Sequence, residues 1–163
     1  MHITFVSYLD PFAYHGGGEM VLRAAIAHGR RRDHRITVLS RRNGKFSRMF
    51  APALTRPRET ELYILADVFN CPEDHLPLDF AFLRSIVEHE PFIHWDNAWV
   101  DVCARPALPC HGHRENCPDA CALERARWLY SRALACVFVS PLHARTMEQL
   151  LGDGVVRRRI VAR

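Results

Sequence analysis

The sequence predicts an α/β fold, in which a parallel β-sheet carries helices on both faces. Three observations lead to this prediction. Short apolar runs alternate with amphipathic helical stretches along the chain. A glycine-rich loop joins the first apolar run to the first helix. The length of 163 residues suits one domain with a sizeable core.

The first strand and the first helix flank that glycine-rich loop. Residues 3–8 are typical of a short buried strand, and apolar residues recur at helical spacing from Glu19 onward. Between them lies His15-Gly16-Gly17-Gly18-Glu19. Glycine leaves backbone amides accessible, and a helix N-terminus carries a partial positive charge that favours phosphate. Two interpretations stay open: a phosphate-binding loop, and a tight turn that binds nothing.

A dinucleotide-binding fingerprint fits this loop poorly. The fingerprint needs its glycines directly after the strand, whereas Leu9 to His15 intervene here and Val21 takes the place of the third glycine. The second strand is followed by Ser40-Arg41-Arg42 instead of an acid. We therefore do not expect a nicotinamide site.

The remaining elements alternate in the order that a parallel sheet requires. Segment 41–61 is basic and rich in turn residues, which predicts a loop with a short helix around 46–50. Segment 98–121 is expected to be irregular. Ser140 is predicted to cap the last helix. The expected strands cover 35–39, 61–66, 91–95, 135–139 and 159–162, and the other helices cover 79–89, 123–134 and 141–151.

The composition, with 48% apolar and 25% charged residues, is ordinary for a globular protein. No apolar run approaches the roughly 20 residues that a membrane span needs, and the N-terminus lacks a signal-peptide pattern. We therefore expect a cytoplasmic location. The net charge is +4, and arginines are clustered at 30–32, 41–42 and 157–159. These clusters are interpreted as solvated ends of strands and helices, and weak contact with an anionic membrane surface is the alternative. Nucleic-acid binding is not expected, because no reader motif accompanies these arginines.

The order of these features resembles the N-terminal half of family 4 glycosyltransferases, which are two-domain enzymes of GT-B architecture. The stretches that carry the resemblance are the opening strand, Gly16-Gly17-Gly18-Glu19 with its helix, Arg35–Leu39, and Ala135–Ser140 followed by Arg159–Ala162. The resemblance implies one Rossmann-like N-terminal domain over residues 1–163, with a Cys/His-rich insert at about 98–121. The C-terminal donor-binding domain is absent from these residues, so we expect a fragment or one subunit of a split transferase.

The family transfers a sugar from a nucleotide-sugar donor to an acceptor, with retention of configuration and without a required metal. By resemblance, this domain would bind a sugar or lipid-linked acceptor and help to hold the donor diphosphate, and a C-terminal domain or partner subunit would bind the rest of the donor. A non-catalytic Rossmann-like binding module with a zinc-stapled loop is the alternative. The residues predicted to bind substrate or phosphate are Tyr14, His15, Gly16, Gly17, Gly18, Glu19, Asp96, Asn97 and Ser140.

His94 is the predicted catalytic residue, because a histidine after the fourth strand often lies close to the reacting sugar in this family. Trp95 interrupts the usual histidine–acid pair, so Asp96-Asn97 could occupy the same place instead. We expect His94 to position a hydroxyl group and not to act as a strong base. The structural alternative is a histidine that hydrogen-bonds the backbone.

Four cysteines, Cys103, Cys110, Cys117 and Cys121, lie within the irregular segment, with His111 and His113 among them. Thiolates and imidazoles are the usual ligands of structural zinc, although the spacing is not the paired C-x2-C of zinc ribbons. Structural zinc and reduced, unligated thiols both stay open, and disulfides are disfavoured in a cytosolic chain. Cys136, inside an expected core strand, is interpreted as an ordinary buried thiol.

Overall fold

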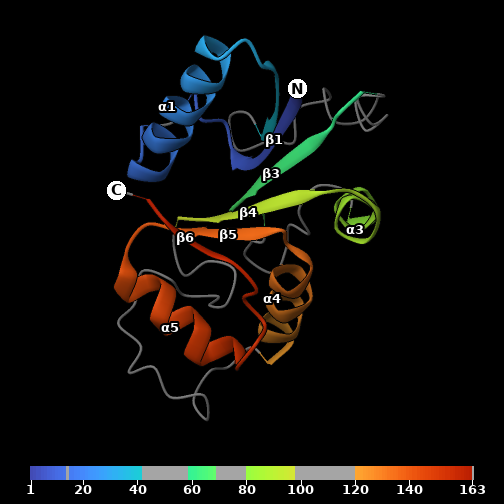
Figure 1. The fold of residues 1–163 in the computed structure, drawn as a ribbon, viewed down its shortest axis with the longest axis vertical. Helices are drawn as coiled ribbons and strands as arrows, with labels where there is room; N and C mark the ends of the chain where they lie inside the picture. Colours follow the sequence, from blue (N-terminus) through green and yellow to red (C-terminus); the bar gives the residue numbers. More distant parts are fainter. Residues whose placement is uncertain (14, 42–58, 69–79, 98–119, 163) are drawn as a thin grey trace.

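The computed structural model describes residues 1–13, 15–41, 59–68, 80–97 and 120–162, and this part of the chain contains six strands and four helices (Figure 1). In chain order they are β1 (His2–Leu9), α1 (Gly17–Arg31), β2 (Arg35–Arg41), β3 (Leu62–Ala66), α3 (Phe80–His89), β4 (Phe92–Asp96), α4 (Ala120–Arg132), β5 (Ala135–Phe138), α5 (Pro141–Leu151) and β6 (Arg159–Val161).

All six strands are parallel and form one sheet in the order β2-β1-β3-β4-β5-β6. The chain leaves β1 toward β2 and then returns to the opposite side of β1 to build β3 through β6. Because right-handed crossovers that run in opposite directions lie on opposite faces, this reversal separates α1 from the later helices. Figure 1 shows α1 on one side of the sheet and α4 and α5 on the other.

The predicted α/β class and the parallel sheet are therefore confirmed, and the chain has the Rossmann-like pattern of alternating strands and helices. Helix α4 is shifted from its expected range, since it begins at Ala120 and ends at Arg132. It ends early because the backbone N–H of Leu134 donates to the carbonyl of Phe92 (2.9 Å), which brings the chain into the sheet. The expected helix at 46–50 lies outside the described residues, and so does the Cys/His-rich insert apart from Ala120 and Cys121, which begin α4 and are not irregular as expected.

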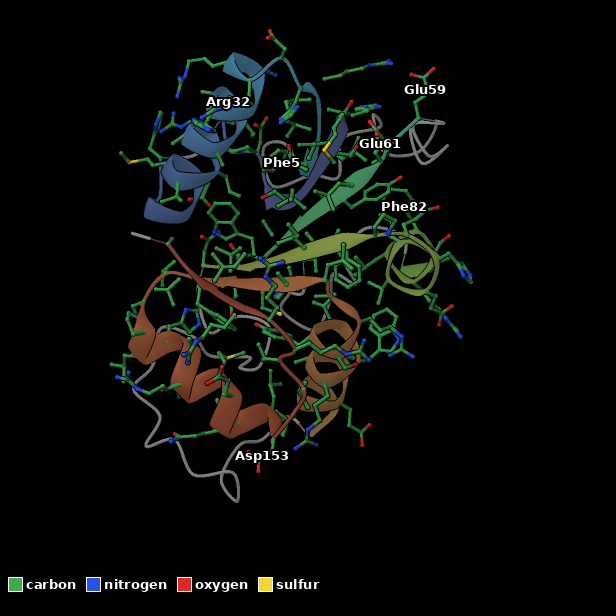
Figure 2. The ribbon with its side chains drawn as sticks, in the orientation of Figure 1. Phe5, Arg32, Glu59, Glu61, Phe82 and Asp153 are labelled. Carbon is green, nitrogen blue, oxygen red and sulfur yellow. The ribbon has the colours of Figure 1, made fainter. Side chains whose placement is uncertain are left out.

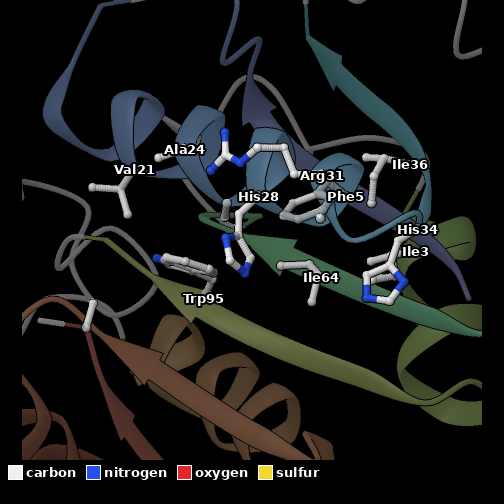
Figure 3. A pocket seen from close by; sticks show the side chains of 13 residues that line it. Ile3, Phe5, Val21, Ala24, His28, Arg31, His34, Ile36, Ile64 and Trp95 are labelled. Atoms are coloured by element: carbon white, nitrogen blue, oxygen red, sulfur yellow. The ribbon is translucent and has the colours of Figure 1, made fainter.

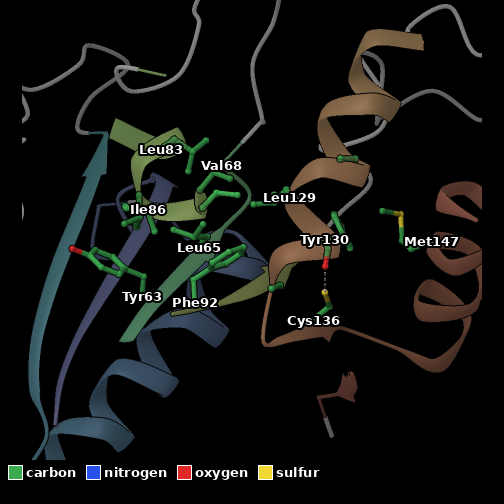
Figure 4. Packing of buried hydrophobic residues seen from close by; sticks show 14 of the residues in the cluster. Tyr63, Leu65, Val68, Leu83, Ile86, Phe92, Leu129, Tyr130, Cys136 and Met147 are labelled. Carbon is green, nitrogen blue, oxygen red and sulfur yellow. Dashed lines mark hydrogen bonds between the residues drawn. The ribbon is translucent and has the colours of Figure 1, made fainter. Parts of the chain in front are cut away.

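The larger hydrophobic core lies on the face covered by α3, α4 and α5. Leu65 and Phe92 from the sheet pack there with Leu83 and Leu129 from the helices, all at 2% exposure or less. Figure 4 shows this cluster, with Met147 of α5 at its far side. Because these side chains are buried and closely packed, they hold the three helices firmly against this face of the sheet.

A smaller core lies between α1 and the other face of the sheet. Leu22 and Ile26 of α1 pack there against Phe5 and Ile64. In Figure 2, Phe5 marks this side of the molecule and Phe82, on α3, marks the side of the larger core. Among the described residues, no helix is both long and apolar enough to cross a lipid bilayer.

Candidate functional site

The order of the strands reverses at β1, so β1 and β3 form the switch point of the sheet. In open parallel sheets, ligands bind beside the carboxyl ends of the strands at such a point. The glycine turn, Gly16–Gly18, lies here because it follows β1 and leads into α1, which begins within the turn at Gly17. The predicted position of this loop at the ligand edge is consistent with the strand order.

The glycine turn is open at its middle residue and covered at its two ends. A Cβ built at Gly17 would meet no atom of the described residues within 4 Å, apart from its chain neighbours and the backbone of its own helix. At Gly16 a Cβ would lie 2.2 Å from the Glu19 carboxylate, and at Gly18 it would lie 3.0 Å from the Asn97 side chain. Among the described residues, no side chain therefore covers Gly17, but Glu19 places a carboxylate beside Gly16, the N-cap of α1, which as a glycine has no side chain to cap the helix.

Asn97 is held beside Gly18 by Asp67, which follows β3. The two Asp67 carboxylate oxygens accept hydrogen bonds from the Asn97 backbone N–H (3.0 Å) and from its side-chain Nδ2 (2.8 Å). Asp67 has a left-handed φ of 49°, a conformation that Asp and Asn adopt more readily than most residues. Because Nδ2 faces a carboxylate, the amide orientation is determined. The Asn97 Oδ1 is buried and has no hydrogen-bond partner in the described part of the chain.

His94 lies inside the protein. It has 0% of its surface exposed, and its Nδ1 lies 3.1 Å from the backbone carbonyl of Leu65 on the neighbouring strand. Since a carbonyl only accepts, this nitrogen carries the hydrogen. The ring packs edge-on against Tyr130 with centroids 4.4 Å apart. The structure thus has the backbone-bonded histidine that was the structural alternative for this residue, and its catalytic role stays a prediction.

Asp96 is the centre of a buried polar group on the same face as His94. Its Oδ2 accepts the hydroxyl hydrogen of Tyr130 (2.5 Å) and lies 3.2 Å from Nε2 of His143 on α5. Asp96 is 0% and His143 is 4% exposed. A buried carboxylate needs such partners, because leaving it unpaired would cost several kcal/mol. Asp96 therefore links β4 to α4 and α5, and in this structure it does not reach solvent.

Ser140 caps α5, as predicted, because its hydroxyl oxygen accepts the backbone N–H of His143 (3.1 Å). A substrate contact by Ser140 stays a prediction. His15 is exposed beside the glycine turn, and Tyr14 lies outside the described residues.

The zinc prediction also falls mostly outside the described chain. Cys103, Cys110 and Cys117 are not described, and Cys121 lies in the first turn of α4 without a described side chain. Among the residues that the structure describes, no group of three or more His, Cys, Asp or Glu side chains could hold a metal ion. Cys136 is a buried free thiol within β5, as expected, and its Sγ lies 4.0 Å from the Tyr130 carbonyl (Figure 4).

The sequence analysis did not single out Asp67, Tyr130 or His143. Asp67 could have been predicted from the sequence, because an acidic residue that directly follows an apolar strand of a parallel sheet lies at the edge where ligands bind. Tyr130 and His143 could be inferred only from the alternation in β4, where His94 and Asp96 share the buried face with Phe92 and need polar partners.

Comparison of the chain with protein-family models, with curated protein sequences and with solved structures returned no match.

Proposed function

We propose that this chain is the acceptor-side domain of a retaining glycosyltransferase, whose glycine turn helps to hold the diphosphate of a nucleotide-sugar donor. The resemblance to family 4 glycosyltransferases supplies the reaction class. The observation that carries the proposal is the open backbone at Gly17, at the first turn of a helix of 15 residues and beside the switch point of the sheet. Backbone amides at such a turn suit an anionic leaving group.

The chemistry assigned to this domain is positioning. The amides of the glycine turn would stabilise negative charge that develops on the departing diphosphate. The buried Oδ1 of Asn97 accepts hydrogen bonds only, so it would receive a hydroxyl group of the acceptor or the donor sugar. Glu19 would have to turn away from Gly16, because its carboxylate would repel a phosphate there. No metal is required, and a second domain or a partner subunit would complete the donor site.

A non-catalytic binding module is the second candidate, and the burial of His94 favours it. The residue predicted to act on the sugar has no exposed surface and bonds the backbone of Leu65. A module of this kind would use the same glycine turn to bind an anionic ligand without transferring a sugar.

The test is a titration of the purified chain with inorganic pyrophosphate and with UDP-glucose, followed by NMR of the backbone amides. We expect the amides of Gly17 and Gly18 to shift, and we expect Gly17→Val to abolish the shifts because its side chain would occupy the open side of the turn. Ala27→Val is the matched control, since Ala27 is exposed in the same helix away from the turn. Unchanged binding by Gly17→Val would remove the turn from the function.

Sugar transfer separates the two candidates. The wild-type chain, combined with a donor-binding domain, should transfer a sugar, and Gly17→Val should reduce that rate by at least about tenfold. Pyrophosphate binding without any transfer by the assembled pair would favour the binding module instead.

A further inference from the structure

A groove of about 580 Å³ opens between α1 and the sheet, and Gly16, Gly17 and Gly18 do not line it. This volume lies within the range of about 300–1,000 Å³ typical of small-molecule sites. Figure 3 shows the helix on one side of the groove and the strands on the other. The residues that line it are Ile3, Phe5, Val21, Ala24, Ala25, His28, Gly29, Arg31, His34, Ile36, Ile64, Trp95 and Ala162.

The inner surface of the groove is apolar and concave. Phe5, Ile64 and Trp95 contribute from the sheet, and Val21 and Ala24 contribute from the helix. Val21 and Ala24 are exposed although they face this apolar surface. In the described part of the chain α1 is the one helix on this face, so nothing described there covers the groove. An open apolar recess of this kind marks a binding site more often than plain surface does.

Basic side chains stand at one end of the groove. Arg31 from the last turn of α1 and His34 from the loop after it line that end, and His28 points from α1 toward the sheet near Ile64 and Trp95 (Figure 3). None of the ion pairs identified among the described residues includes these three side chains. Arg31 carries a permanent positive charge, and imidazole N–H groups can donate to an anion. This end is therefore complementary to a negative head group.

We propose that the groove binds a single-chain anionic amphiphile, with its alkyl or prenyl chain between Val21 and Trp95 and its phosphate or carboxylate head at Arg31. Val21 and Arg31 are ten positions apart in one helix, which corresponds to about 15 Å along the groove. A recess of this length accommodates one extended chain. The inference does not depend on the glycosyltransferase proposal, because none of its residues belongs to the glycine turn.

The test is calorimetric titration of the purified chain with dodecyl phosphate below its micelle concentration, together with tryptophan fluorescence. We expect saturable binding and a change in emission that Trp95→Phe removes. Ala24→Phe should fill the groove and weaken binding by at least about tenfold. Ala27→Phe is the matched control and should bind as wild type does, since Ala27 is exposed in α1 but does not line the groove. Circular dichroism establishes that both variants fold.

The head group is tested separately. Arg31→Gln should weaken dodecyl phosphate binding by about threefold to tenfold and reduce its salt dependence, whereas Arg32→Gln, at an exposed position outside the groove, should not. Inorganic phosphate alone and neutral dodecyl maltoside should bind more weakly than dodecyl phosphate. Equal binding by Ala24→Phe, or binding only to anionic vesicles, would overturn the proposal. A dimer in solution that Ala24→Phe dissociates would assign the groove to a second copy of the chain instead.

Discussion

The two faces of the sheet differ in how completely they are covered. Leu65 and Ile64 are neighbours in β3 and point to opposite faces. Leu65 enters a core closed by three helices, whereas Ile64 lines the groove beneath α1. The same strand therefore contributes to a closed core on one side and, on the other, to a smaller core that borders an open groove.

Buried polar groups lie on both faces of the sheet. On the closed face, Asp96 has Tyr130 and His143 as partners within hydrogen-bonding range. On the face of α1 and at the edge of the sheet, the buried Nε1 of Trp95 and Oδ1 of Asn97 have no partner among the described residues.

The largest expected effect tests the difference in packing directly. Leu65→Ala should lower the free energy of unfolding by about 3–4 kcal/mol, since the cavity would lie in a closed core. Ile64→Ala should lower it by only about 2 kcal/mol, because that side chain already borders open space. Urea denaturation of both variants measures the difference. Equal losses would mean that the face of α1 is as tightly packed as the other face.

An intermediate effect tests the buried polar group. Tyr130→Phe removes a hydrogen bond to a buried carboxylate and should lower the free energy of unfolding by about 2 kcal/mol. A double-mutant cycle with Asp96→Asn separates this bond from other consequences of either change. Additive losses in the cycle would show that the two side chains do not act together, and would leave His143 as the main partner of Asp96.

The smallest effect sharpens the description of the glycine turn. Gly17→Ala should change the free energy of unfolding by no more than about 0.5 kcal/mol, because its methyl group meets nothing. Gly18→Ala should be the more destabilising of the two, since its Cβ would press on the Asn97 side chain that Asp67 holds in place. Thermal unfolding of the pair, compared with wild type, measures both changes. A greater loss for Gly17→Ala would show that the turn is not open at that residue.

Local patterns were sufficient for much of the fold. The apolar runs around Phe5 and Val137 predicted strands, and the Ser140-Pro141 pair predicted the start of α5. These predictions succeed because strand pairing, helix periodicity and capping depend on residues within a few positions of one another. The end of α4 was predicted two residues too late, because Leu134, which follows the helix, donates its backbone N–H to Phe92 of β4, a contact that no local pattern contains.

The candidate site, like the fold, could be predicted from the sequence only in part. The sequence by itself determined that a glycine turn would lead into α1, that Ser140 would cap a helix, and that Asn97 would follow the fourth strand, whereas Asp96, expected after that strand, is its last residue. Only the tertiary structure decided that His94 faces the closed core, that Asp67 holds Asn97 beside Gly18, and that a groove opens beneath α1. The physical reason is that the face on which a side chain lies follows from the strand order and the crossover direction, and both are properties of the whole sheet.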